Sequence, residues 1–433
     1  MNLCLFLLGA VPVSRGPPPC HNSTGTKGSP SSVGAFKLPI ASEFSYSGLA
    51  ANDITGFAQD GREIAVLGLT TRTLLFDITD KSNAQLISTI VPTNPRNSAW
   101  ADIKYWNRRV YVGTEDNTGI EVIDVDDLDS PQFIRQRPLS NSHNIYVDAD
   151  GYLYIVGNND DDLIVFDLNA DPLLQNSPVG TWSGKYIHDL EVLNNKLYGA
   201  CIYNGVVIVL DVQDKSNIQL LRTITTFSGA GYSTHDVAIT PDEAYLLTAD
   251  ERTGGSVSIF DLAATTDNNN PVKVGEYHSS DPSWQSHSVH NIYIRDSRFL
   301  ISSYYTDGTR IVDINDPSSP VEVAYNDFVG VGGLYAGNWG TYAALPSGYV
   351  ISSDIENSRL VVLQPSVELW YVSSLDTNAD GQLNIIDIVE TVESILDSTG
   401  GNDFNVDGTT NIVDVLLLVD YVLNRKDKPL ESF

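Results

Sequence analysis

The sequence predicts a mainly β fold, a seven-bladed β-propeller followed by a small α-helical calcium-binding domain. The first observation is a repeated unit of short β-type runs, closed in six copies by an aspartate; these aspartates lie 43 to 52 residues apart. A period of about 40 to 50 residues with four strands is typical of a propeller blade. The second is a pair of Asp- and Asn-rich loops 27 residues apart. We therefore divide the chain into a leader (1–34), a propeller (35–366) and a tail domain (367–433).

The composition limits the partners. The chain has 25 basic and 55 acidic residues, a net charge of −30, which argues against nucleic acid or an anionic membrane surface as a partner. Three cysteines are too few for a disulfide framework, and Cys201 falls in a predicted buried strand.

The leader predicts secretion. Residues 3–13 are apolar enough for the core of a signal peptide, and residues 15–34 are rich in Pro, Ser, Thr and Gly. No run reaches the roughly 18 to 20 apolar residues of a membrane helix. We expect an extracellular or cell-surface protein without a membrane span.

The repeat is clearest over residues 145–168. Runs at 145–147, 153–156 and 163–168 are rich in β-branched and aromatic residues and are separated by Asp, Asn and Gly. This pattern predicts antiparallel strands joined by hairpins. An acid or amide begins the innermost strand of six copies: Asp53, Asp102, Asn144, Asp189, Asp236 and Asn291. A seventh, degenerate copy runs through 339–342.

The closing aspartates have a predicted structural role. A carboxylate at the end of a strand can accept hydrogen bonds from the free N–H groups of the turn that follows. The six residues are Asp77, Asp124, Asp167, Asp211, Asp261 and Asp313. Prolines after several of these turns predict outer strands at a sheet edge.

The seventh copy has no outer strand after Gln364 and Pro365. The segment 36–46 precedes the first copy and has no other place in the pattern. We predict that it returns as the outer strand of blade seven and closes the ring, which removes a free sheet edge.

The repeat resembles a known family. A Leu/Val-Ile-Val-Asp strand followed by an Asp-Pro-Ser/Asn-Pro turn, clearest over 311–321, resembles the LVIVD-repeat propellers. The ordered series Ser142-His143-Asn144, Ile187-His188-Asp189, Thr234-His235-Asp236, Val289-His290-Asn291 and 337–340 is similar to the choice-of-anchor B family. That resemblance implies a secreted, bacterial-type propeller with an attached C-terminal anchor, and it supplies no activity.

The tail carries two predicted calcium loops. Oxygen ligands occupy positions 1, 3, 5, 9 and 12 of each loop, with Gly at position 6, and position 7 offers its carbonyl. The first set is Asp376, Asn378, Asp380, Gln382, Asn384 and Asp387. The second is Asp403, Asn405, Asp407, Thr409, Asn411 and Asp414. We expect two bound calcium ions.

An apolar stripe follows each loop and predicts one helix after each, with the two stripes packed together. The stripes comprise Ile385, Ile388, Val389, Val392, Ile395 and Leu396, then Ile412, Val415, Leu416, Val419, Val422 and Leu423. Aspartate at position 12 and a single helix after each loop resemble a type I dockerin. That resemblance implies a protein partner contacted at Ile385, Ile386, Ile412 and Val413, where many cellulosomal dockerins carry Ser or Thr. A calcium-stabilised cap without a partner is the alternative.

Four histidines occupy one register of blades three to six, namely His143, His188, His235 and His290, and His278 and His287 lie near the last. Equivalent positions in successive blades converge on the central channel. Neutral imidazoles brought together there could hold a transition metal, with Asp53 and Asp102 as further ligands from blades one and two. The alternative is that each histidine bridges its blade to the next by hydrogen bonds to backbone and that the two aspartates cap the strand turns.

We expect a binding protein whose propeller takes an unknown ligand and whose tail attaches to a protein partner. The alternatives are a metal-dependent enzyme using the channel histidines and a carbohydrate-processing component held by its tail.

Overall fold

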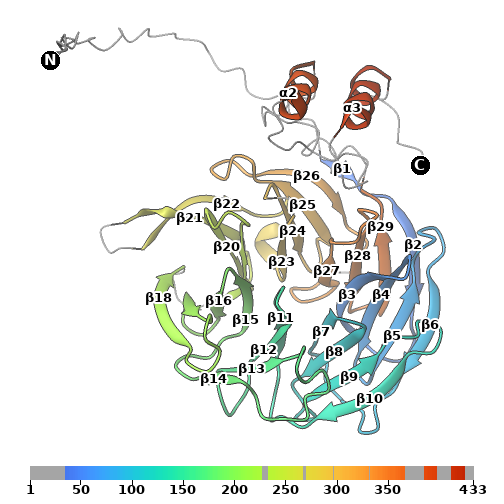
Figure 1. The fold of residues 1–433 in the computed structure, drawn as a ribbon, viewed down its shortest axis with the longest axis vertical. Coiled ribbons are helices and arrows are strands. Elements are labelled where there is room, and N and C mark those ends of the chain that lie inside the picture. Colours follow the sequence, from blue (N-terminus) through green and yellow to red (C-terminus); the bar gives the residue numbers. More distant parts are fainter. Residues whose placement is uncertain are drawn as a thin grey trace, which may run out of the picture. The chain divides into compact units, whose positions relative to one another are not determined.

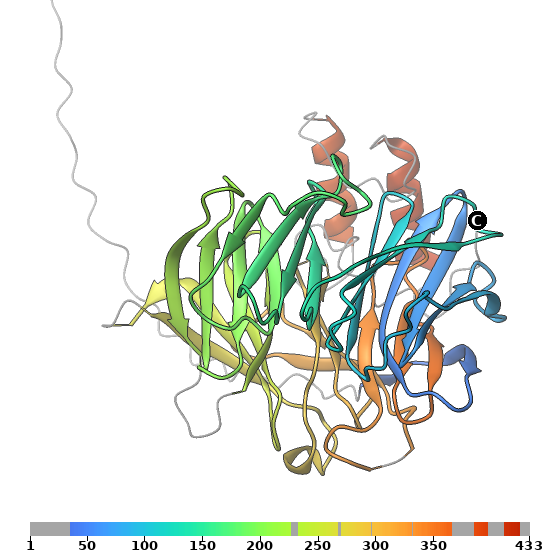
Figure 2. The same cartoon turned by 90° about the horizontal axis from the view of Figure 1, so that it is seen from below.

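The computed structural model describes residues 35–226, 233–266, 270–295, 297–330, 332–365, 385–396 and 411–424. Within these ranges, seven sheets, each with four antiparallel strands, surround a central channel (Figure 1), and each sheet is one blade. Viewed edge-on, the strands of each blade run between the two faces of the ring (Figure 2). The predicted seven-bladed propeller is therefore confirmed.

The strands of each blade follow one another along the chain from the channel outwards, except in blade seven. Blade one contains β3 (Ala51–Gln59), β4 (Arg62–Leu69), β5 (Arg72–Asp77) and β6 (Gln85–Ile90). Blade two contains β7 (Ala101–Trp106), β8 (Arg109–Thr114), β9 (Ile120–Asp124) and β10 (Gln132–Arg137). Blade three contains β11 (Asn144–Val147), β12 (Tyr152–Val156), β13 (Leu163–Asp167) and β14 (Gly180–Trp182). Blade four contains β15 (Asp189–Leu193), β16 (Lys196–Cys201), β17 (Val206–Asp211) and β18 (Gln219–Thr225).

The remaining blades follow the same plan. Blade five contains β19 (Thr234–Ile239), β20 (Tyr245–Asp250), β21 (Val257–Thr265) and β22 (Pro271–Tyr277), and the 3₁₀ helix η1 (Trp284–Ser286) lies in the connection that follows. Blade six contains β23 (Ile292–Arg295), β24 (Phe299–Ser303), β25 (Thr309–Asp313) and β26 (Val321–Asn326). Blade seven contains β27 (Asn338–Tyr342), β28 (Val350–Asp354), β29 (Arg359–Leu363) and, outermost, β2 (Ile40–Ser45).

The predicted closure of the ring is confirmed. Strand β2 pairs antiparallel with β29, with Phe44 opposite Leu360. One pairing was not predicted: β1 (Phe36–Lys37) adds a short parallel strand to the edge of blade six, with Phe36 opposite Ala324. The pattern could not show it because two residues carry no periodicity.

The core lies between the blades. Seven apolar clusters are found in the described ranges, one at each junction of neighbouring blades. Strand β13 shows how the alternation of side chains produces them. Leu163 and Val165 face blade four, whereas Ile164 and Phe166 face blade two, because successive side chains of a strand point to opposite faces. Cys201 is buried in the cluster between blades three and four.

The closing aspartates take their predicted places. In all six blades the Oδ1 atom accepts a hydrogen bond of 2.8–2.9 Å from the backbone N–H two residues later. These side chains fix the turns and lie away from the channel.

The tail contributes two described helices, α2 (Ile385–Leu396) and α3 (Ile412–Asn424), which pack on each other. Ile388, Val415 and Leu418 are buried. The predicted packing of the two stripes on each other involves only part of each stripe, since Ile385, Val389, Leu396, Ile412 and Leu416 are exposed. Two short helices contact each other along one narrow line. Stripe residues three or four positions from a contacting residue can therefore lie beside this line, where solvent reaches them. Neither described helix is long and apolar enough to span a membrane.

Candidate functional site

Aspartates at the start of the innermost strands link each blade to the next. Asp53 Oδ2 accepts a hydrogen bond of 2.9 Å from the Ile103 N–H, and Asp102 Oδ2 accepts one of 2.7 Å from Ile145. Asp236 Oδ2 accepts one of 2.7 Å from Ile292. These carboxylates therefore bind backbone donors of the following blade.

The four histidines form an arc around one end of the channel. The ring centroids of His143 and His188 are 4.0 Å apart, those of His188 and His235 4.2 Å, and those of His235 and His290 4.4 Å. The His290 ring lies a further 4.4 Å from that of Trp339 in blade seven. The structure thus brings together the four side chains that the repeat places in one register.

Three of the histidines make hydrogen bonds through Nδ1. His188 Nδ1 lies 3.2 Å from the His235 carbonyl oxygen, and His290 Nδ1 lies 2.5 Å from the Trp339 carbonyl oxygen. His143 Nδ1 contacts Glu115 Oε1 of blade two at 2.6 Å. The His188 and His290 contacts reach backbone oxygens of the next blade, as the structural interpretation of the histidine register expects. His143 departs from it, because its partner is a side chain of the preceding blade.

His235 differs from the other three. It is almost fully buried, and its Nδ1 atom has no hydrogen-bond partner among the described residues. Its Nε2 atom lies 3.7 Å from Glu251 Oε2. His235 belongs to two groups whose ligand atoms all lie within 4.8 Å of one another, one with His188 and Asp189 and one with Glu251 and His290.

Burial sets the protonation of these side chains. It lowers the pKa of His188 and His235 well below the ordinary value, and neighbouring imidazoles lower it further. Burial also lowers the pKa of His290 to about 3. All three rings are therefore neutral at pH 7, with a lone pair on one nitrogen of each.

The channel acids respond in the opposite sense. Burial raises the pKa of Asp53 and Asp189 well above the ordinary value and raises that of Asp236 to about 7. Although burial opposes it, the Lys104 ammonium, 2.5 Å from Asp102 Oδ1, helps to lower the pKa of Asp102. The charges of Asp102 and Lys104 therefore offset each other. The repulsion among Asp53, Asp189 and Asp236 would be relieved by protonation of these carboxylates or by a bound cation.

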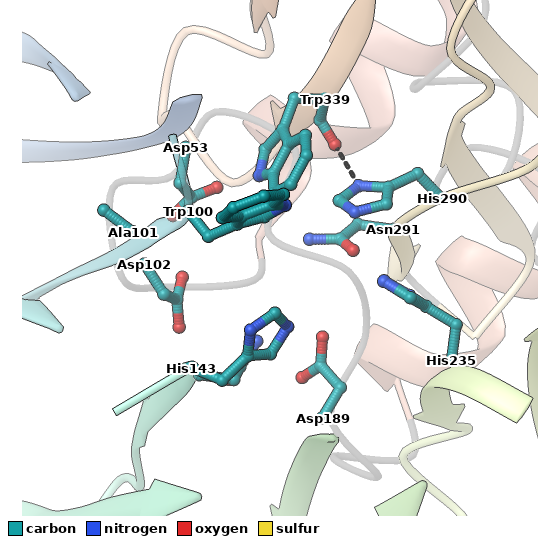
Figure 3. Close-up of a pocket in the computed structure, with 11 residues that line it drawn as sticks. Asp53, Trp100, Ala101, Asp102, His143, Asp189, His235, His290, Asn291 and Trp339 are labelled. Carbon is teal, nitrogen blue, oxygen red and sulfur yellow. Dashed lines mark hydrogen bonds between the residues drawn. The ribbon is translucent and has the colours of Figure 1, made fainter. Parts of the chain in front are cut away.

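A cavity of about 20 Å³ lies at the centre of this arrangement (Figure 3). The sequence-predicted residues Asp53, Asp102, His143, His235 and His290 line it, together with Asn144, Asp189, Asn291, Trp100, Ala101 and Trp339. Figure 3 shows the Asp189 carboxylate pointing into the space between His143 and His235. A cavity of this size holds a water molecule or an ion, but no organic substrate.

Two candidate histidines lie elsewhere. His278 stacks on Trp284 with ring centroids 3.9 Å apart, and His287 contacts the buried Asp307. Asp281, His287 and Asp307 form a third group of ligand atoms within 4.8 Å of one another. The sequence pattern did not select Asp189 as a ligand, although it directly follows His188. It also missed Glu251, whose equivalent in blade two is the His143 partner Glu115, and Asp307.

The predicted calcium ligands fall mostly outside the described residues. These are Asp376, Asn378, Asp380, Gln382 and Asn384 in the first loop and Asp403, Asn405, Asp407 and Thr409 in the second. Asp387 and Asp414 are buried in the first turns of α2 and α3. Asn411 Oδ1 accepts a hydrogen bond of 2.9 Å from the Val413 N–H, and Asp414 Oδ2 accepts one of 2.8 Å from the Asn411 N–H. This reciprocal pair caps α3.

The four predicted partner-contact residues are exposed. The exposed fractions are 64% for Ile385, 49% for Ile386, 63% for Ile412 and 44% for Val413. Each pair lies in the first turn of its helix.

Comparisons with known proteins address the fold. No family model matches the chain, and no curated protein matches it. One similar solved structure is the crystal structure of the Cps50 (Swd1) β-propeller domain of Myceliophteria thermophila. It has a TM-score of 0.54 and 10% sequence identity, over 76% of this chain and 100% of that chain. At this identity the likeness shows the fold alone. The resemblances to LVIVD-repeat propellers and to dockerins therefore stay predictions. The chain is described by its fold, as a seven-bladed β-propeller.

Proposed function

We propose that this chain is a secreted or cell-surface binding protein without catalytic activity, held to a protein partner through its calcium-dependent, dockerin-like tail. The observation that carries this proposal is the exposure of four large aliphatic side chains, Ile385, Ile386, Ile412 and Val413, in the first turns of α2 and α3.

The arrangement of these side chains suits binding to a partner protein. Two aliphatic residues occupy corresponding positions of the two helices, directly before the buried Asp387 and Asp414. Burying one such side chain contributes about 1.5–3 kcal/mol. A partner that covers both pairs would therefore gain much of its affinity from them, and calcium would act by fixing the helix starts.

The channel favours binding over catalysis. Its cavity of about 20 Å³ admits an ion or a water molecule, and three of its four histidines make hydrogen bonds to neighbouring blades. An organic or protein ligand of the propeller would therefore bind outside this cavity. Carbohydrate processing rests on the dockerin resemblance alone, so a partner assay takes precedence over substrate screens.

The test uses the immobilised full-length protein and the surface fraction of the source cells, with calcium and with EGTA. We expect a distinct protein to be retained with calcium and released by EGTA, and its retention to be lost in the Ile385→Asp/Ile412→Asp variant. Leu220→Asp is the matched control, because Leu220 is a similarly exposed aliphatic residue on β18. Equal retention by all three proteins, or retention unaffected by EGTA, would contradict the proposal.

A further inference from the structure

The junction of blades four and five gathers three metal-ligating side chains. His188 and Asp189 come from the start of β15, and His235 comes from β19. All three are buried, and their ligand atoms lie within 4.8 Å of one another. Zinc–ligand bonds of about 2.0–2.2 Å place ligand atoms roughly 3–4 Å apart, so small side-chain movements would bring the three groups onto one ion.

The state of His235 points to a ligand. A neutral imidazole has one N–H donor and one acceptor nitrogen, and a buried one normally satisfies both. Here Nδ1 has no hydrogen-bond partner among the described residues, although the side chain is nearly inaccessible and lines the cavity.

The other two side chains are held in position. His188 Nδ1 contacts the His235 carbonyl oxygen at 3.2 Å, which leaves Nε2 as its ligand atom. Asp189 Oδ1 accepts a hydrogen bond of 2.7 Å from the Leu190 N–H, while the carboxylate points into the cavity (Figure 3). Hydrogen bonds of this kind orient the ligands of protein metal sites.

The electrostatics also favour a cation. Burial keeps both imidazoles neutral at pH 7, as a metal ligand requires. Burial and the charges of Asp236 and Asp102 raise the pKa of Asp189, and Lys104 and the Leu190 N–H offset only part of that rise. Lys104 forms its ion pair with Asp102.

We propose that the channel binds one divalent transition-metal ion through His188, Asp189 and His235. Two imidazole nitrogens and one carboxylate oxygen suit Zn²⁺, Fe²⁺ or Mn²⁺ better than Ca²⁺ or Mg²⁺, which prefer oxygen ligands. The cavity of about 20 Å³ beside these side chains has room for one such ion. The ion bridges blades four and five. Its three ligands are different residues from the predicted calcium ligands, so this proposal does not depend on the proposed partner binding.

The first experiment is a zinc titration of the full-length protein in excess calcium, which keeps the tail loops filled. We expect one zinc ion per chain by calorimetry, a raised Tm, and an X-ray absorption spectrum of bound zinc with imidazole and oxygen scattering. This spectrum needs no variant. A folded wild-type protein that binds no zinc, or whose bound zinc lacks imidazole scattering, would overturn the proposal.

Variants identify the ligands. Asp189→Asn and His235→Gln are expected to weaken zinc binding at least 10-fold. The matched controls are Asp53→Asn and His143→Gln, which change the same residue types at the same register in blades one and three and line the same cavity. They should bind zinc within about threefold of the wild type. Equal affinity in all variants, or equal loss in variants and controls, would overturn the ligand set.

Discussion

Asp236, on the innermost strand of blade five, accepts a hydrogen bond of 2.7 Å at Oδ2 from the backbone N–H of Ile292 in blade six. Its other oxygen, Oδ1, accepts a bond of 2.6 Å from the Val237 N–H. One carboxylate therefore satisfies a buried donor on each of two neighbouring blades. Asp102 repeats the arrangement between blades two and three with Ile103 and Ile145.

Removing this link should destabilise the ring. We expect Asp236→Ala to lower the free energy of unfolding by about 1–3 kcal/mol, because the Ile292 N–H is left buried without a partner. The measurement is thermal unfolding by circular dichroism. Asp211→Ala is the control, since Asp211 accepts a bond in an exposed turn; a loss in the control as large as in Asp236→Ala would contradict the expectation.

The buried ion pair between Arg96 and Glu121 gives a second prediction. Arg96 Nη1 lies 2.6 Å from Glu121 Oε2, and both side chains are inaccessible. Arg96→Met should destabilise the protein by about 3–5 kcal/mol, because it leaves a buried acid without its partner, and Arg96→Met/Glu121→Met should recover most of that loss. Lys273→Met, which breaks the exposed pair with Glu276, should cost less than about 1 kcal/mol. A double variant no more stable than Arg96→Met would argue against this explanation.

Glu191 should make stability depend on pH. Burial raises its pKa to about 8, against the lowering effect of the bond that Oε2 accepts from the Ile239 N–H. Between about pH 4.5 and 8 the folded state keeps this proton and the unfolded state does not, so stability falls as pH rises. Glu191→Gln should flatten the decline of Tm over this range. Glu276→Gln is the control because the pKa of Glu276 is lowered; identical slopes in the wild type and Glu191→Gln would refute the assignment.

Calcium removal should act on the tail alone. If bound calcium supplies much of the folding energy of residues 367–433, EGTA will make this segment sensitive to protease while a fragment close to 35–365 survives. Limited proteolysis followed by mass spectrometry measures this. The Asp376→Ala/Asp403→Ala variant should be cleaved similarly even with calcium present. Protection of the tail in EGTA equal to that in calcium would exclude the calcium loops as its source of stability.

The sequence was sufficient for the ring and for the meeting of the four channel histidines. In a ring of repeated blades, residues at the same position of the repeat lie at the same height around the channel. The shared position of His143, His188, His235 and His290 therefore predicted that their rings meet. The six closing aspartates were predictable for a simpler reason, because each bonds a donor only two residues away.

Two further residues of the site were not predicted, because they lie outside the two positions on which the copies were aligned. Glu251 approaches His235 from the end of β20, and Asp307 contacts His287 from the β24–β25 turn. Glu251 occupies the position in blade five that Glu115 occupies in blade two. The copies were aligned on the start of the innermost strand and on the closing aspartate, so the alignment selected neither Glu251 nor Asp307. The exposure of Leu416 could not be predicted either. A helical stripe shows which face of a helix is apolar, but not how much of that face a partner helix covers.

The pairing of β2 with β29 has a consequence for biosynthesis. Glu43 and its partner Arg359 are 316 residues apart in the chain. At a synthesis rate of about 5–20 residues per second, roughly 15 to 60 s pass before the last blade offers its edge to the first strand. During that interval β2 could pair with the exposed blade edge of a neighbouring nascent chain instead of with β29 of its own chain. The same connection that closes the finished ring therefore leaves β2 without its partner strand until the last blade has been synthesised.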